Sequence, residues 1–324
     1  MEHRACDCKR PMWPALLKER ELYVMEQVLM NTFEHLLSVN SYLLTDGAMG
    51  TMLMAAGLEH GNAPEEWNVS HPRPVQAVHR SYIQAGSRII LTNSFGGSRF
   101  RLKLHNLQGR VAELNRAAAA LARKAAKSAP HPVAVAGSMG PSGELFRPMG
   151  RLTFDEARDG FAEQAAALAE GGVDVLWIET MSDLQEVQAA IEGLRMVTEL
   201  PVVSTMTFDT HGRTMMGVAP VRALEAMREM GSTALGGNCG NGPAEIEGVI
   251  QAMHAADPTV VLVAKSNAGI PRYVDGVLTY DGTPKVMARH ALRVRSLGAK
   301  IIGACCGSTP DHIRAMAQAL DSGL

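Results

Sequence analysis

Three cysteines carry the clearest chemical signal in this sequence of 324 residues. Cys305 and Cys306 are adjacent near the C-terminus, and Cys239 lies upstream in the segment ALGGNCG. Both the pair and the single cysteine end a short apolar run and are followed by glycine. A structural zinc ion is closed by four protein ligands, whereas a catalytic zinc ion keeps one position open. Three thiols therefore predict a zinc site whose open position suits a thiol substrate.

The alternative for these cysteines is that they are small buried hydrophobic residues, a common fate of free cysteine. Their positions at the ends of expected strands favour a metal site instead. The chain holds 5 cysteines, an odd number, and the other two are Cys6 and Cys8. A disulfide framework is not expected from this number and spacing. Cys6 and Cys8 could together bind a soft metal, but we favour the interpretation in which they have no metal role.

Charge and hydropathy exclude several classes of protein. The formal net charge is −2, from 31 basic and 33 acidic side chains, so no basic footprint for nucleic acid or an anionic membrane is present. The apolar runs are too short to span a bilayer, and the N-terminus lacks a signal-peptide core. We expect a cytoplasmic protein with small-molecule partners, and the sequence indicates no oligomeric state.

Eight short apolar runs alternate with helical patterns, which is typical of a (β/α)8 TIM-type barrel. A doubly wound open sheet is the alternative, but no G-x-G-x-x-G motif follows the first run. We predict one barrel domain over residues 41–324, preceded by a partly helical N-terminal extension over residues 1–40. The expected strands are 42–45, 88–92, 133–137, 173–178, 201–205, 233–236, 260–263 and 300–302, and the expected helices are 74–86, 114–127, 154–171, 183–198, 219–231, 244–256 and 284–298.

The active site of such a barrel forms at the C-terminal ends of its strands, and all three cysteines fall there. Glu179 ends an otherwise apolar strand, where it would either bind a substrate ammonium group or form a buried structural ion pair. Asp46-Gly47 follows the first strand and could hold a carboxylate through backbone N–H groups, although such a pair is more often only a turn.

A long segment without clear periodicity runs from Gly47 to Pro72 and contains Trp67. We expect a loop at the site face, because connections of this length are commonly functional. Trp67 could form one wall of a cation–π pocket for a methyl donor, or it could simply pin the loop to the barrel.

With these residues in view, the chain resembles the homocysteine S-methyltransferase family from about Leu43 to Leu320. The resemblance implies a (β/α)8 barrel that holds Zn²⁺ through Cys239, Cys305 and Cys306. It also implies that Glu179 binds the homocysteine amine, that Asp46, Gly47 and Thr92 hold its amino-acid end, and that Trp67 and Phe95 line the donor pocket. The motifs are DGAMGT (46–51), TNSF (92–95), GSMGP (137–141), ET (179–180), GGNCG (236–240), NAG (267–269) and GACCG (303–307).

The methyl donor is the point at which this chain departs from the betaine-dependent branch of the family. Gly96 and Thr180 stand where the animal betaine enzymes have tyrosines. We expect a freestanding enzyme with a diffusible onium donor, glycine betaine first and S-methylmethionine or another sulfonium as the alternative. Two alternatives of other classes are a zinc metallohydrolase and a zinc-binding barrel without methyltransferase activity.

Overall fold

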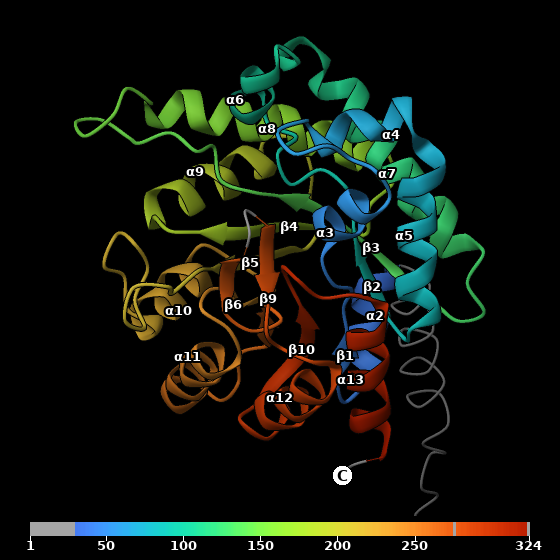
Figure 1. Ribbon diagram of the computed structural model, residues 1–324. Coiled ribbons are helices and arrows are strands. Elements are labelled where there is room, and N and C mark those ends of the chain that lie inside the picture. The colour runs from blue at the N-terminus through green and yellow to red at the C-terminus, as the bar shows by residue number, and fades with distance from the viewer. Residues whose placement is uncertain (1–29, 275–276, 323–324) are drawn as a thin grey trace, which may run out of the picture.

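A closed barrel of eight parallel strands forms the centre of the molecule (Figure 1). The computed structural model describes residues 30–274 and 277–322. Neighbouring strands pair in the order β1-β10-β7-β6-β5-β4-β3-β2, and a parallel bridge between Thr45 and Ile89 joins the two ends of this series. The predicted (β/α)8 fold is therefore confirmed. The strands are β1 (Leu43–Leu44), β2 (Ile89–Leu91), β3 (Ala134–Met139), β4 (Val175–Met181), β5 (Val202–Met206), β6 (Ala234–Cys239), β7 (Leu262–Ser266) and β10 (Ala299–Ala304).

Helices between successive strands cover the outside of the barrel (Figure 1). Helix α5 shows why they form: Pro72 occupies its first turn, and Val75, Val78 and Tyr82 make one buried face. All seven predicted helices are confirmed, and α13 is an additional one. The helices are α5 (Pro72–Gln84), α7 (Val111–Lys127), α8 (Phe154–Glu170), α9 (Leu184–Arg195), α10 (Pro220–Glu229), α11 (Pro243–Ala256), α12 (Pro284–Ser296) and α13 (Pro310–Ser322).

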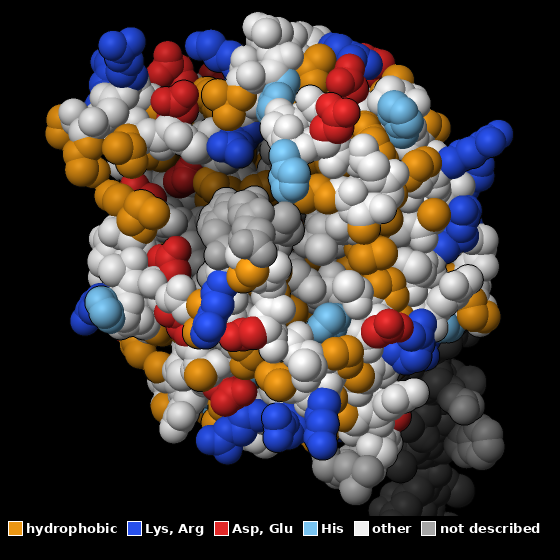
Figure 2. Space-filling view, in the orientation of Figure 1, with side chains coloured by type: hydrophobic (Ala, Val, Ile, Leu, Met, Phe, Trp, Pro, Cys, Tyr) orange, Lys and Arg blue, Asp and Glu red, His pale blue; other side chains and the backbone are white. Residues whose placement is uncertain are grey.

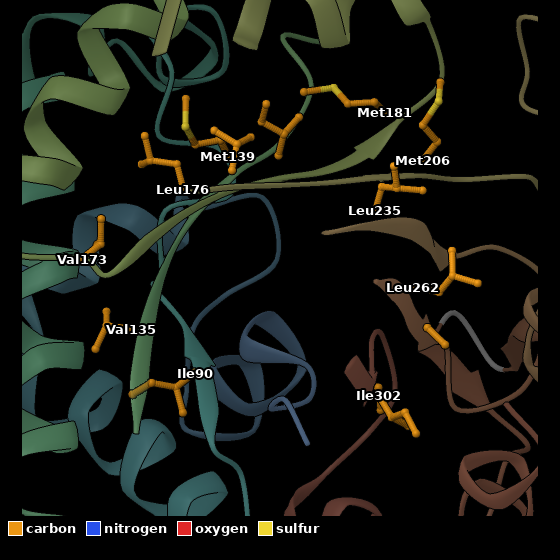
Figure 3. Close-up of a cluster of buried hydrophobic side chains, with 14 of the residues drawn as sticks. Ile90, Val135, Met139, Val173, Leu176, Met181, Met206, Leu235, Leu262 and Ile302 are labelled. Carbon is orange, nitrogen blue, oxygen red and sulfur yellow. The ribbon is translucent and has the colours of Figure 1, made fainter. Parts of the chain in front are cut away.

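Alternate residues of each strand build two separate cores. Outward-facing side chains such as Ile90, Leu176 and Ile302 pack against the helices (Figure 3). Inward-facing side chains fill the barrel, and several of them are small, including Ala134 and Ala234. Small residues are needed there because the fully buried Trp177 takes up much of the interior.

Helix α2 (Thr32–Val39) belongs to the barrel's packing although it lies in the predicted N-terminal extension. Phe33 and Leu36 are buried and join the cluster of inward-facing residues. The Asn31 side chain donates a hydrogen bond of 2.9 Å to the carbonyl of Asp174, just before β4. The described part of the extension thus packs at the N-terminal end of the barrel, while Cys6 and Cys8 lie outside the described residues.

Two connections differ from expectation. The segment 47–72 was expected to be a loop, which is wrong, since it contains α3 (Met49–Ala55), the 3-10 turn η1 (Pro64–Glu66) and α4 (Trp67–Ser70). These short helices are held by tertiary packing, as the fully buried Leu53 shows, and so leave little periodic signal. The hairpin of β8 (Pro271–Val274) and β9 (Val277–Tyr280), which was not predicted, follows β7 and overlies the barrel strands in Figure 1.

The remaining short elements, α6 (Arg99–Leu102) and the 3-10 turns η2 (Lys103–His105) and η3 (Gln108–Arg110), lie between β2 and α7. None of the helices in the described part of the chain is both long enough and apolar enough to cross a bilayer.

Candidate active site and metal centre

The three cysteines predicted to bind a metal lie together at the C-terminal ends of β6 and β10. Their sulfur atoms are all within 4.8 Å of one another, and the Sγ atoms of Cys239 and Cys305 are 2.9 Å apart. Among residues 30–274 and 277–322, this is the group of histidine, cysteine and acidic side chains that could hold a metal ion. All three cysteines are partly exposed to solvent.

Asn267 holds the two cysteine segments in place from the end of β7, which lies between β6 and β10. Its Oδ1 atom accepts a hydrogen bond of 3.1 Å from the backbone N–H of Cys306, and its Nδ2 atom donates one of 2.6 Å to the carbonyl of Gly240. The backbone N–H of Cys305 donates to the carbonyl of Ser266 at 2.7 Å. One asparagine of the NAG motif therefore fixes the separation between Cys239 and the cysteine pair.

Cys239 and Thr180 are both in the left-handed backbone region, with φ of 60° and 64°. Such conformations cost free energy in residues other than glycine and cluster at functional sites. The Asn238 side chain supports both residues, because it accepts a hydrogen bond from the backbone of Thr180 and donates one to the Thr180 hydroxyl. The Thr180 hydroxyl in turn lies 3.9 Å from the Cys239 sulfur.

The thiol chemistry of the cluster fits a soft divalent ion. The neighbouring thiols Cys239 and Cys305 lower the pKa of the Cys306 thiol. Tyr280, at the end of β9, has a smaller effect on the pKa of this thiol in the same direction. A metal ion would replace the protons that the sulfurs share, and three thiolates select zinc over calcium or magnesium.

The loop after β1 is joined directly to the cysteine pair. Ser308 donates a hydrogen bond of 2.7 Å to the carbonyl of Cys305 and accepts one of 3.0 Å from the N–H of Ala48. A Cβ atom on Gly47 would lie 2.3 Å from the Ser308 hydroxyl, so only glycine permits this approach. The loop predicted to bind the substrate is thus linked, through Ser308, to the segment that carries two of the predicted metal ligands.

Asp46 is buried inside the barrel with an exposed fraction of 2%. Its Oδ2 atom accepts a hydrogen bond of 2.7 Å from the backbone of Leu91, which ties β1 to β2. Its Oδ1 atom makes no hydrogen bond with the described residues, but lies 3.6 Å from the ammonium group of Lys265. Burial raises the pKa of Asp46 to about 7, against the opposing effect of Lys265.

Glu179 lies on the neighbouring part of the interior wall, at the C-terminal half of β4. Ser138 donates a hydrogen bond of 2.5 Å to its Oε1 atom, and the Lys265 ammonium lies 3.9 Å from its Oε2 atom. Burial raises the pKa of the Glu179 carboxyl, although Lys265 opposes the shift. Glu179 therefore lies within ion-pair distance of a buried lysine, as one of its two interpretations requires, and the binding of a substrate ammonium group stays a prediction.

Lys265 of β7 is the central residue that sequence reasoning missed. The signal was present, because a lysine interrupts the apolar run VVLVAKS in the same way that Glu179 interrupts its own strand. The expected strand ended at residue 263, three positions before the end of β7, so the lysine was not placed inside the barrel. Tyr280 was missed for a different reason, since the hairpin that carries it was not predicted.

Thr92 is buried, and its hydroxyl makes its hydrogen bonds to other residues of the protein. This oxygen accepts a hydrogen bond of 3.0 Å from the N–H of Ser138 and lies 2.6 Å from the Ser94 hydroxyl. Ser138 is the residue that holds Glu179, so Thr92 acts on the expected ammonium site through one intermediate.

The two predicted donor-pocket residues have different surroundings. Phe95 is 39% exposed, and its ring lies over Gly140 so closely that a Cβ atom there would be 2.6 Å away. Trp67 stacks on His71 with ring centroids 4.6 Å apart and packs against the outer core. Phe95 therefore presents a free aromatic surface at the strand ends, whereas Trp67 is engaged by its own chain.

Charged side chains of both signs are spread over the face in Figure 2. A surface hollow lies at α6 and α8, where Arg99 donates a hydrogen bond of 2.7 Å to Glu163. Neither the thiols nor the buried carboxylates line this hollow, so it is separate from the candidate site.

Comparison with known proteins agrees with the residue pattern. A sequence model of the family described as Homocysteine S-methyltransferase matches residues 43–320. Methionine synthase of Mycobacterium tuberculosis is 33% identical over 297 residues, which cover 86% of this chain but 24% of that protein. The corresponding protein of Mycobacterium leprae is 32% identical over the same shares. The chain thus spans about a quarter of the length of these relatives.

Solved structures agree on the fold. The metallated form of the homocysteine methyltransferase MmuM from Escherichia coli superimposes with a TM-score of 0.76 at 24% identity, covering 89% of this chain and 99% of that one. A methyltransferase from Methanosarcina mazei gives a TM-score of 0.59 at 14% identity, covering 88% of this chain and 95% of that one. At these identities the likeness concerns the fold alone. By the family match over residues 43–320, this chain belongs to the homocysteine S-methyltransferase family.

Proposed function

We propose that the protein transfers a methyl group from a small onium donor, glycine betaine in the first place, to the thiolate of L-homocysteine in a zinc-dependent reaction that forms methionine. One observation carries the proposal: three thiols gather within 4.8 Å at the barrel mouth, joined through Ser308 to the loop that bears the buried Asp46. A metal site and an amino-acid site would then be adjacent, as a substrate with a thiol at one end and an ammonium group at the other requires.

Cys239, Cys305 and Cys306 would hold the zinc ion. Bound zinc would lower the pKa of a coordinated thiol so that its thiolate forms near neutral pH. Asn267 and Asn238 keep the three cysteines in register before any substrate arrives, through the hydrogen bonds to Cys306, Gly240 and Thr180. Such pre-organisation reduces the entropy that binding must overcome.

The amino-acid end of homocysteine would be held by Glu179 and by the loop that carries Asp46 and Gly47. Glu179 supplies a buried carboxylate for the ammonium group, and its orientation is fixed by the hydrogen bond from Ser138. We assign Thr92 an indirect part, because its hydroxyl accepts the hydrogen bond from the N–H of Ser138.

The exposed ring of Phe95 supports an onium donor, because cations are attracted to the faces of aromatic rings. Trp67 would contribute a second wall only if its ring turned away from His71. In the reaction the substrate sulfur forms a bond to the methyl carbon while the carbon–nitrogen bond of the betaine breaks. The nitrogen keeps the electron pair and leaves as a neutral amine. All participants are small molecules, and we expect the reaction to take place in the cytoplasm.

The test is an assay of the zinc-loaded protein with L-homocysteine and a panel of donors that includes glycine betaine and S-methylmethionine. Cys305→Ala is expected to lose its zinc and to form methionine more than about a hundredfold more slowly, since even residues around a metal ligand change activity by 10–100-fold. Cys8→Ala is the matched control and should behave like the wild type. No methionine from any donor, or undiminished activity of Cys305→Ala, would overturn the proposal.

A further inference from the structure

Lys265 is an ammonium group enclosed in the barrel, with an exposed fraction of 3%. Lysine is almost never fully buried unless it is paired, because removing its charge from water is costly. Its neighbours account for the burial. Trp177 lies below it, with the ring centroid 5.5 Å from Nζ, and the carboxylates of Asp46 and Glu179 lie 3.6 Å and 3.9 Å away.

The geometry of these three groups is that of one cation shared by two anions. Both separations exceed the 2.7–2.9 Å or so of a strong charge-assisted hydrogen bond, so Lys265 is not committed to either carboxylate. Asp46 and Glu179 have other anchors, namely the Leu91 amide and the Ser138 hydroxyl. With all three groups ionised, the cluster has a net charge of −1 and lacks one positive charge.

We propose that Lys265 is a positioning residue that sets this site to accept a single ammonium group, by neutralising one of the two buried carboxylates and leaving Glu179 for the substrate. The inference rests on the proposed function, in which Glu179 binds the amine of homocysteine. On ammonium binding, Lys265 pairs with Asp46, and the enclosed charges sum to zero. Without the lysine, two uncompensated carboxylates would remain, and one of them would take up a proton instead of the substrate.

Other groups also face this cluster and act on it. Cys305 and Cys239 approach from β10 and β6, and Tyr82 approaches Asp46 from α5. Lys265 is the one cation within ion-pair distance of both carboxylates among the residues that the structure describes.

The experiment compares Lys265→Met, which keeps an unbranched side chain one atom shorter than lysine and removes the charge, with Lys265→Arg and the wild type. Lys127→Met, on the exposed face of α7, is the matched control. Methionine formation is measured as a function of pH, together with direct binding of L-homocysteine to the zinc-loaded protein by calorimetry. We expect Lys265→Met to raise the KM for homocysteine at least about tenfold at pH 7, with a smaller change in kcat. The acid limb of its kcat/KM profile should move up by about 1–3 pH units, the usual effect of an opposite charge at this distance.

Lys265→Arg should restore the acid limb to within about one pH unit of the wild type, because it returns the charge. An unchanged KM and an unchanged acid limb in Lys265→Met would overturn the inference. So would an equal loss in Lys265→Arg and Lys265→Met when both fold and bind zinc, because shape and not charge would then matter. If the wild type neither binds nor methylates homocysteine, the proposed function itself fails. This result differs from the two outcomes for the Lys265 variants that would overturn the inference.

Discussion

The two ends of the barrel interior differ in the side chains that the same strands place there. At the N-terminal end, Phe33 and Leu36 of α2 pack with inward-facing aliphatic side chains, and the result is a closed apolar core. At the C-terminal end the interior holds charged Asp46, Glu179 and Lys265. Apolar burial stabilises the fold, at about 25 cal/mol per Å². Buried charged groups contribute little to the stability of the fold and often reduce it.

The barrel interior is thus divided into an apolar region that stabilises the fold and a charged region at the candidate site. Trp177 marks the boundary, because its ring belongs to the apolar cluster while the Lys265 ammonium lies over it. Changes below Trp177 should therefore alter stability without altering the site. Changes above it should alter binding with a smaller effect on stability.

The largest expected effect on stability comes from Phe33→Ala at the apolar end. Removal of a fully buried phenylalanine typically costs about 3–5 kcal/mol. Chemical denaturation should show this loss, while zinc content and the KM for homocysteine stay at wild-type values under native conditions. Loss of zinc from the folded variant would show that the two ends are not independent.

A smaller effect, and one that depends on pH, is expected from His79 in the helical wall. Burial lowers the pKa of His79 to about 4, and both ring nitrogens lack hydrogen-bond partners among the described residues. In the unfolded chain His79 binds a proton below about pH 6.5, whereas in the folded chain it stays neutral down to about pH 4. The free energy of unfolding is therefore highest above about pH 6.5 and falls as the pH drops toward 4. This difference in pKa between the folded and unfolded chain corresponds to a loss of about 3 kcal/mol in the free energy of unfolding.

His79→Leu should remove this dependence. Its unfolding free energy, measured from pH 7 to pH 4, should fall by about 3 kcal/mol less than that of the wild type. The acid limb of methionine formation should be the same in both proteins, since His79 lies outside the mouth. A displaced acid limb in His79→Leu would place this histidine in contact with the chemistry.

The smallest effect is expected from Asn267→Ala at the mouth. This substitution removes the hydrogen bonds to Cys306 and Gly240 but leaves all three thiols. Zinc affinity, measured by competition with a chelator, should fall about 10–100-fold, as is usual for residues that orient metal ligands. Ser322→Ala, at the exposed end of α13, is a suitable control. Unchanged zinc affinity in Asn267→Ala would mean that the strands alone position the cysteines.

The sequence predicted the barrel well because each strand is a short apolar run with a polar residue or a cysteine near its C-terminal end or directly after it. Glu179 and the three cysteines stood out for this reason. Lys265 obeys the same rule, but small and polar residues around it hid the end of the strand. The Asp275-Gly276 pair between two β-rich runs is a hairpin signal that was overlooked.

Other features could not be predicted from local pattern. The helical period of Phe33 and Leu36 is visible in the sequence, but their partner, the N-terminal end of the barrel, exists only after the strands close. The role of Asn267 is similar, because it bridges segments that are distant in the chain. Hydrogen bonds of this kind depend on tertiary contacts that no periodicity encodes.

The proposed function depends above all on the binding of the homocysteine sulfur at a metal ion held by Cys239, Cys305 and Cys306. It is tested most directly by replacing zinc with cobalt(II) and recording the sulfur-to-cobalt charge-transfer absorption during titration with L-homocysteine. We predict that the band intensifies as a fourth sulfur joins the three cysteines, and that L-homoserine, which has a hydroxyl in place of the thiol, causes no such change. A spectrum that does not change with homocysteine at saturating concentration would contradict the account.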